Sequence, residues 1–158
     1  MKDLSDDKKV EVLLAALNER YESLRAIRER VQSVGIWALG IFVAAGGAVI
    51  GNAVSLTIAQ KALYIVGIVL AVIALRFKYL ADLSAGFKNQ QRVAARLEQA
   101  LGLYTPGVLD DRSDSVYPSE WKQAGTIRGG GRFFRSTHLL LYVGVTFFIA
   151  SILLSGNW

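Results

Sequence analysis

Three stretches of the chain contain no charged residue, and every acid and base lies before or between them. The stretches cover residues 31–60, 62–75 and 136–158. A helix needs about 20 apolar residues to cross a hydrocarbon core roughly 30 Å thick. The first and third stretches are long enough. The second is short, but its flanking bases Lys61 and Arg76 can run along apolar surface and place their charges at the headgroups. The pattern predicts three membrane-spanning helices.

The first two spans are expected to continue beyond the membrane. From Val10 to Val31 the apolar positions alternate spacings of four and three, which is typical of coiled-coil packing. No Gly or Pro interrupts this pattern before Gly35, so one helix is predicted from about Ser5 to Leu56. The same spacing recurs over residues 83–104. The two extensions can pack against each other as an internal antiparallel pair, or against neighbouring subunits.

The predicted fold class is an all-α integral membrane protein whose first two transmembrane helices extend into a cytoplasmic helical stalk. The expected segments are an amphipathic cytoplasmic helix (1–33), transmembrane helix 1 (34–58), an external hairpin (59–61), transmembrane helix 2 (62–77), a second cytoplasmic amphipathic helix (78–101), a cytoplasmic loop with a basic juxtamembrane segment (102–135) and transmembrane helix 3 (136–155).

The distribution of basic residues predicts the orientation. Residues 1–30 and 76–135 together contain 17 of the 18 Lys and Arg residues, and the hairpin between the first two spans has only Lys61. Basic residues are retained on the cytoplasmic side of a membrane. We therefore expect a membrane protein with a cytoplasmic N-terminus and an external C-terminus. The acidic start of the chain does not resemble a secretory signal.

The residue types do not point to an enzyme. The only histidine, His138, lies at the entrance to the third span and suits an interfacial residue better than a general base. Asp110, Asp111 and Asp114 could hold a divalent cation, although a solvated acidic turn is the simpler interpretation. The chain has no cysteine, so a disulfide or a thiolate metal site is excluded. We expect no catalysis, no cofactor and no metal site.

Small and polar residues of the first span are candidates for helix packing. The small residues fall four apart in two rows, which allows close helix approach in lipid. The candidates for packing or oligomerisation are Gly40, Ala44, Gly47, Ala48 and Gly51. Two interpretations are open, namely packing against the second span of the same chain and homo-oligomerisation. Asn52 and Ser55 are candidates for lining a pore, although Asn52 can also cap the external hairpin.

An acid-free basic segment precedes the third span. Its bases are Lys122, Arg128, Arg132 and Arg135. Three consecutive glycines, residues 129–131, leave backbone amides open to an anion, and arginines bind phosphate in bidentate fashion. One interpretation is a site for a phosphate-bearing ligand such as a nucleotide or oligonucleotide. The other is a segment that holds anionic lipid headgroups.

The arrangement of elements resembles a known class of proteins. An arginine-rich amphipathic helix, Leu17-Asn-Glu-Arg-Tyr-Glu-Ser-Leu-Arg-Ala-Ile-Arg-Glu-Arg30, leads into a glycine-rich span, a tight hairpin, a second span and a second amphipathic helix. Over residues 5–101 this plan is similar to the SLATT-type membrane effectors of bacterial conflict systems and to the membrane effector of Hailong anti-phage systems. The third span departs from the two-span SLATT plan. The resemblance implies an oligomeric channel, a nucleotidyltransferase partner and control by DNA oligomers.

These observations lead to two hypotheses about function. The first is a homo-oligomeric inner-membrane effector that opens an ion path in anti-phage defence under the control of a cytoplasmic nucleotide or oligonucleotide. The alternative is a non-conducting anchor or scaffold whose helical stalk recruits a soluble cytoplasmic partner. Conductance distinguishes the two hypotheses.

Overall fold

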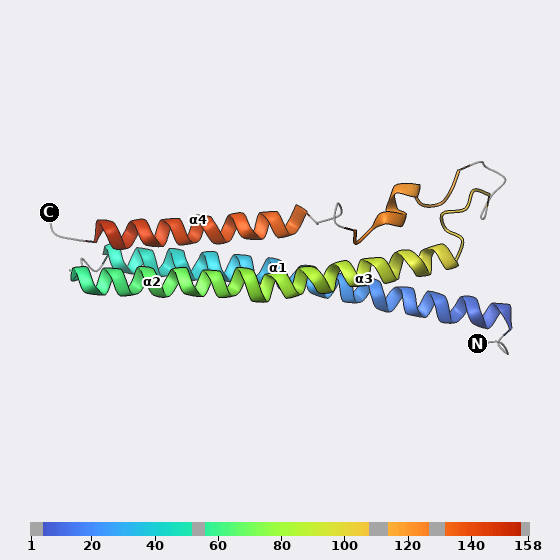
Figure 1. Cartoon of the computed structure of the whole chain (residues 1–158), viewed down its shortest axis with the longest axis horizontal. Helices are drawn as coiled ribbons and strands as arrows, with labels where there is room; N and C mark the ends of the chain where they lie inside the picture. Colours follow the sequence, from blue (N-terminus) through green and yellow to red (C-terminus); the bar gives the residue numbers. More distant parts are fainter. Residues whose placement is uncertain (1–4, 52–55, 108–113, 127–131, 156–158) are drawn as a thin grey trace. The chain divides into compact units, whose positions relative to one another are not determined.

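Helices make up the structure of the chain (Figure 1). This computed structural model describes residues 5–51, 56–107, 114–126 and 132–155. Within these ranges the elements are α1 (Asp6–Gly51), α2 (Ile58–Ala74), the π-helix η1 (Leu75–Leu80), α3 (Ala81–Ala100), the 3-10 helix η2 (Ser119–Gln123) and α4 (Arg132–Leu154). No strand occurs among the described residues, so the predicted all-α class is confirmed for them.

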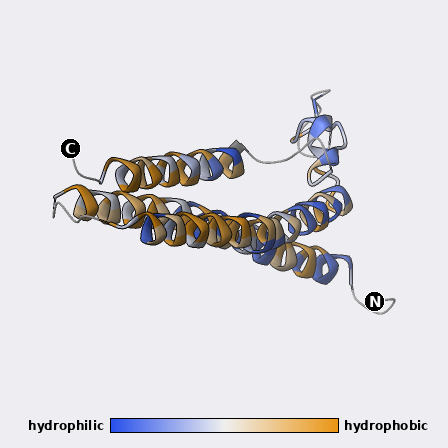
Figure 2. Ribbon diagram, turned by 60° about the vertical axis from the view of Figure 1, so that its left-hand side comes forward, coloured by the Kyte–Doolittle hydropathy of each residue, from blue (hydrophilic) through white to orange (hydrophobic). Residues whose placement is uncertain are grey.

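Three helical stretches of the described chain are long and apolar enough to cross a membrane. They are Asp6–Gly51, Ile58–Ala100 and Phe133–Leu154. Figure 2 shows hydrophobic residues along most of the helix that leads to the C-terminus, with hydrophilic residues at its start. The second stretch reaches its length because α2, η1 and α3 follow one another without an interruption of helix. The charge-free part of this second stretch is short, but the continuous helix is still long and apolar enough to cross a membrane.

Helix α2 starts earlier than the charge pattern predicts. The backbone N–H of Gln60 donates to Oγ1 of Thr57 at 3.3 Å, and the backbone N–H of Thr57 donates to Oε1 of Gln60 at 3.0 Å. This reciprocal pair is a capping box, which fixes the helix start at Ile58. The prediction of an external hairpin at residues 59–61 is therefore wrong, because these residues form the first turn of α2.

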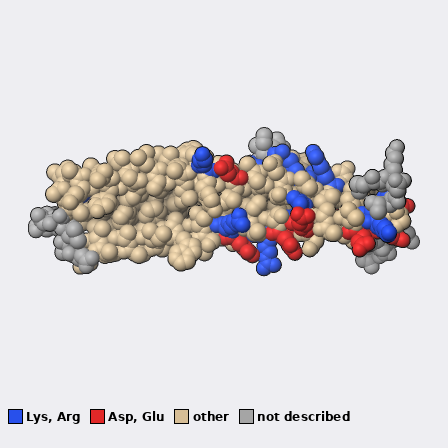
Figure 3. All heavy atoms as spheres, turned by 90° about the horizontal axis from the view of Figure 1, so that it is seen from below, with Lys and Arg blue, Asp and Glu red and all other residues tan. Residues whose placement is uncertain are grey.

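The chain divides into two compact units. Residues 1–28 and 84–130 form one, which we call the polar unit, and residues 29–83 and 131–158 form the other, the apolar unit. Helix α1 contributes its first part to the polar unit and the remainder to the apolar unit. On the face in Figure 3, the charged side chains gather over part of the helical surface, and a long stretch of that surface has none.

Within the apolar unit, α1 and α4 approach each other closely at glycines. A Cβ atom built on Gly46 of α1 would lie 2.7 Å from Cε1 of Phe147 and 2.8 Å from Oγ of Ser151, both in α4. A Cβ atom built on Gly144 of α4 would lie 3.1 Å from Cδ2 of Phe42. Such close approach of backbones is how helices associate in lipid. Glycine packing therefore joins the first and third predicted spans.

Within the polar unit, the first part of α1 packs antiparallel to α3. Nη1 of Arg20 donates to Oε1 of Gln90 at 2.9 Å, and the hydroxyl of Tyr21 donates to Oε1 of Glu98 at 2.7 Å. Apolar side chains from both helices are buried here: Leu17, Phe87, Ala94 and Ala95. The predicted internal antiparallel pair is therefore present in this unit.

The connection between α3 and α4 has more structure than the absence of periodicity predicts. After α3 the backbone turns at Gly102, where φ is +76°. The backbone N–H of Tyr117 then donates to the carbonyl of Leu103 at 3.0 Å. The short helix η2 follows, and α4 begins at Arg132, four residues before the expected start of the third span. The first turn of α4 therefore contains charged residues.

Candidate functional site

The predicted packing residues of α1 form an open face of the helix. Gly40, Ala44, Gly47, Ala48 and Gly51 are all exposed. A Cβ atom built on any of these three glycines would meet nothing within 4 Å. The structure therefore gives no support to the interpretation that these glycines pack against the second span of the same chain. The glycines of α1 that do pack, at positions 35 and 46, are not among the predicted residues.

Large apolar side chains flank these small residues on the outside of α1. Ile36 is 64% exposed and Trp37 is 70% exposed. Ile36, Gly40, Val43, Gly47 and Ile50 are spaced by four, three, four and three, and all five are exposed. In a bilayer such a face contacts lipid or another helix. Its alternation of large and small residues is the arrangement that lets a second helix approach closely.

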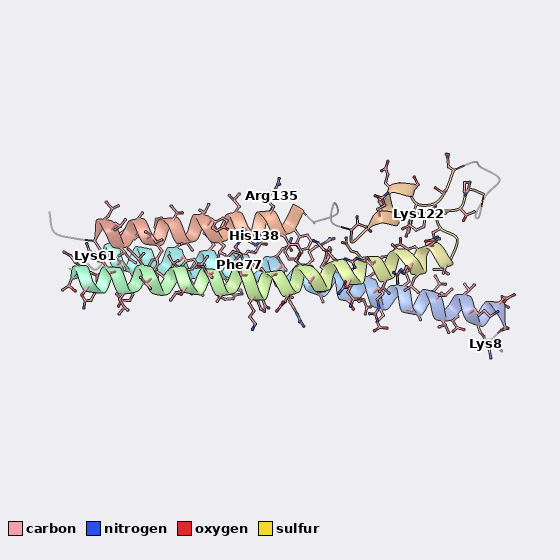
Figure 4. The ribbon with its side chains drawn as sticks, in the orientation of Figure 1. Lys8, Lys61, Phe77, Lys122, Arg135 and His138 are labelled. Carbon is pink, nitrogen blue, oxygen red and sulfur yellow. The ribbon has the colours of Figure 1, made fainter. Side chains whose placement is uncertain are left out.

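The predicted basic segment is only partly described. Lys122 is exposed on η2, and Arg135 is exposed on α4 (Figure 4). Lys122 belongs to the polar unit and Arg135 to the apolar unit. Arg128 lies outside the described residues, as does the side chain of Arg132. The candidate pore residues Asn52 and Ser55 also lie outside them.

Aromatic rings surround Lys122 in the polar unit. Its ammonium nitrogen lies 5.5 Å from the centre of the Tyr104 ring, a cation–π distance. The ring centres of Tyr104 and Tyr117 are 5.9 Å apart, and those of Tyr117 and Trp121 are 5.3 Å apart. Trp121 is 53% exposed. The ring beside Lys122 is buried, and the exposed ring is that of the preceding residue, Trp121. A base and an exposed aromatic ring in one short segment can bind a phosphate-bearing base or an anionic headgroup.

A buried carboxylate supports this aromatic row. Glu98 of α3 is 7% exposed, and its two oxygens accept hydrogen bonds from the hydroxyls of Tyr21 and Tyr104. Burial raises the pKa of both tyrosines well above the ordinary value, and their hydrogen bonds to Glu98 raise it further. The neutral phenols are therefore the form that this arrangement favours.

A second contact holds the connection on α3. Gly125 has φ of +79°, in the left-handed region, and a Cβ atom there would collide with the carbonyl oxygen of Lys88. Nε of Arg92 donates to the carbonyl of Gly125 at 3.0 Å. Neither contact is signalled by the sequence, because they join residues more than 30 positions apart. The segment that carries Lys122 is thus held on α3 at Gly125, and its other end is bonded through Tyr117 to Leu103, just after α3.

The N-terminal end of α1 has an apolar surface that α3 does not cover. Tyr21 is paired with Glu98, and α3 ends at Ala100, so in an antiparallel pair the first turns of α1 extend beyond α3. Val10 is 47% exposed and Leu14 is 52% exposed. Of the predicted coiled-coil positions, Leu17 is thus buried, whereas Val10 and Leu14, which precede it, are exposed.

The remaining candidates add no further site. Among the described residues, no three His, Asp or Glu side chains form a group that could hold a metal ion. Asp110 and Asp111 lie outside those residues. Comparison of the chain with known protein families, with curated proteins and with solved structures gives no match.

Proposed function

We propose that the chain is a homo-oligomeric effector of the bacterial inner membrane that opens an ion path. The observation that carries this proposal is the open face of α1, where a Cβ atom on Gly40, Gly47 or Gly51 would meet no described residue within 4 Å. A second copy can pack its own α1 against this face, and a ring of such contacts encloses a path through the membrane. The proposed N-in, C-out orientation rests on the 17 bases within residues 1–30 and 76–135.

Control of the path by a cytoplasmic ligand is the second part of the proposal. Lys122, Arg128, Arg132 and Arg135 supply the charge for a nucleotide or oligonucleotide, and the exposed Trp121 supplies a stacking surface. A role in anti-phage defence and a nucleotidyltransferase partner rest on the resemblance alone.

A conductance experiment tests the first part. The purified protein is reconstituted in liposomes, and membrane potential and growth are recorded in cells that express it with and without its neighbouring genes. We expect Gly47→Leu to abolish conductance, because the bulky side chain fills the open face without a clash inside the chain. Gly67→Leu on α2 is the matched control, since Gly67 is equally open. A wild-type protein that neither conducts nor depolarises any of these cells excludes the proposal.

A salt titration tests the second part. We expect replacement of Arg128, Arg132 and Arg135 by Glu to weaken binding of an oligonucleotide, and we expect wild-type binding to fall steeply with salt. Anionic vesicles serve as a parallel ligand, because lipid binding weakens by the same mechanism. Oligonucleotide binding that survives the triple replacement places the ligand elsewhere.

The exposed end of α1 favours a second candidate, a non-conducting anchor. Val10 and Leu14 present apolar surface on the polar unit, where a soluble partner can pack. This function predicts a stable complex with a soluble protein and no conductance in liposomes. Replacement of Val10 and Leu14 by Ser then abolishes the complex, whereas the conducting effector keeps its conductance in liposomes after the same change.

A further inference from the structure

A group of basic and aromatic side chains lies at one end of the apolar unit. Arg76 and Lys78 are exposed in η1, and Phe77 between them is 68% exposed. The guanidinium carbon of Arg76 lies 5.3 Å from the centre of the Phe77 ring and 5.5 Å from the centre of the Tyr142 ring. Because Tyr142 belongs to α4, this contact places η1 beside α4.

The face of α4 that meets Arg76 carries a further base. Arg135, His138 and Tyr142 are spaced by three and four residues, so they share one face of the helix. Arg135 is exposed, and His138 is half-buried within electrostatic range of Arg76. Figure 4 shows Arg135 and His138 near the start of α4, with Phe77 on the neighbouring helix. Arg76 and Arg135 thus lie on two adjacent helices that meet at Tyr142, and Lys78 on η1 adds a third base.

This group has no acidic partner within the structure. The described residues of the apolar unit contain only two acids, Glu29 and Asp82. No ion pair joins Arg76, Lys78 or Arg135 to an acid of the described chain. The same three bases also donate no hydrogen bond through their side chains to another described residue. Their charge therefore remains available to an anion from outside the chain.

The depth of the bases matches the boundary of a bilayer. Arg76 lies 18 residues after Ile58, the first residue of α2, which is about 27 Å along a helix. Arg135 lies 19 residues before Leu154, the last residue of α4, which is about 28 Å. A hydrocarbon core is about 30 Å thick. Both arginines therefore reach the headgroup layer when the other ends of their helices lie at the opposite boundary.

We propose that Arg76 and Arg135 bind the phosphate of an anionic lipid headgroup, with Lys78 adding positive charge at the same depth. The Tyr142 ring lies within cation–π distance of the Arg76 guanidinium and holds it beside α4, and the guanidinium can donate two hydrogen bonds to phosphate oxygens. The exposed rings of Phe77 and Tyr79 suit the interfacial layer. The assignment of this lipid to the cytoplasmic leaflet rests on the proposed orientation, whereas the site itself does not depend on conduction.

Native mass spectrometry of the purified full chain tests the site. The protein is released from nanodiscs of phosphatidylglycerol and phosphatidylcholine in equal amounts, and retained lipids are counted. We expect retention of phosphatidylglycerol over phosphatidylcholine, with the preference falling about fivefold for each base removed in Arg76→Gln, Lys78→Gln and Arg135→Gln. Lys61→Gln, which removes one charge at the start of α2, is expected to keep the preference. An equal preference in the wild type and the triple variant overturns the proposal.

One further variant and a competitor, together with Lys78→Gln, distinguish this site from a loss of folding, from unspecific charge attraction and from a soluble phosphate site. Lys78→Gln removes a charge but keeps the contact between Arg76 and Tyr142, so its fall in preference does not depend on a change in folding. Tyr142→Leu is expected to lower the preference while net charge is unchanged, because Arg76 then loses the ring that positions it. Inorganic phosphate added to the released protein is expected not to displace the lipid. Displacement by inorganic phosphate identifies a soluble phosphate ligand and overturns the lipid assignment.

Discussion

Gly46 and Gly47 are neighbours in the sequence but lie on different faces of α1. A Cβ atom at Gly46 would press on Phe147 and Ser151, whereas one at Gly47 would meet nothing within 4 Å. Gly46 therefore fixes the distance between α1 and α4. Gly47 has no such contact among the described residues, so we assign it to the proposed contact between chains. Adjacent positions are thus expected to separate folding of one subunit from assembly of several.

This difference predicts unequal effects of the same substitution. We expect Gly46→Val to destabilise the subunit by about 1–3 kcal/mol, because the added methyl groups push α1 away from α4. Gly47→Val is expected to leave subunit stability unchanged. Thermal unfolding of the purified variants in detergent measures both effects. Equal losses of stability in the two variants contradict the α1–α4 contact.

Glu98 and its two tyrosine donors predict a dependence of stability on pH. The folded-state pKa values of Tyr21 and Tyr104 lie above the ordinary value of about 10. Their contribution to stability is therefore complete below about pH 10 and is lost as the pH rises through the raised values. Thermal unfolding between pH 8 and pH 12 measures this loss.

A double variant checks the origin of that alkaline loss. Replacement of Tyr21 and Tyr104 by Phe removes both phenols, so we expect lower stability at pH 8 but a smaller decrease towards pH 12. Replacing the Tyr104 hydroxyl alone leaves a buried carboxylate with one donor fewer, at a cost of about 1–3 kcal/mol. An unchanged alkaline decrease in the double variant assigns it to other groups.

At the scale of elements, the sequence was informative wherever a local pattern decides the structure. The four-three spacing predicts the antiparallel pair of the polar unit, and the charge-free stretches predict three helices of sufficient length. The start of α2 is also predictable from the sequence, because Thr57 and Gln60 have the spacing of a capping box. The charge of Lys61 instead suggests a later start, at residue 62. Charge marks where a membrane boundary is expected and not where a helix begins.

Contacts between distant segments could not be predicted in the same way. Which of several glycines faces α4 depends on how α4 docks, and the spacing of glycines in α1 alone does not determine that. The contact between Arg76 and Tyr142 likewise joins residues 66 positions apart. Both the open face of α1 and the proposed lipid site are therefore visible only in the tertiary arrangement of the helices.

The docking of the connection on α3 gives a prediction at this scale. Gly125 and Gly107 both have positive φ, and a Cβ atom at Gly125 would in addition strike the backbone of α3. Gly107→Ala is expected to carry the backbone penalty of about 1–2 kcal/mol. Gly125→Ala adds a steric clash, so we expect it to release the segment around η2 and to speed its cleavage by protease. Equal cleavage rates in the two variants exclude this docking contact.

At the scale of the whole molecule, the proposed functions all depend on which side of the membrane each charged segment occupies. The chain contains no cysteine, so a single introduced cysteine reports one position without background. Lys8, Lys61 and Lys122 are exposed or half-buried and lie on α1, α2 and η2 (Figure 4). They therefore serve as three probes of orientation.

In intact spheroplasts, a membrane-impermeant maleimide is expected to label Lys61→Cys and to leave Lys8→Cys and Lys122→Cys unlabelled. Permeabilisation is then expected to expose the latter two, because the positive-inside rule places their segments in the cytoplasm. Labelling of Lys8→Cys before permeabilisation reverses the orientation. A reversed orientation removes the cytoplasmic ligand site and the cytoplasmic-leaflet lipid together, but it leaves the open face of α1 and its oligomer untouched. The topology experiment therefore separates the sensing part of the proposal from the assembly part.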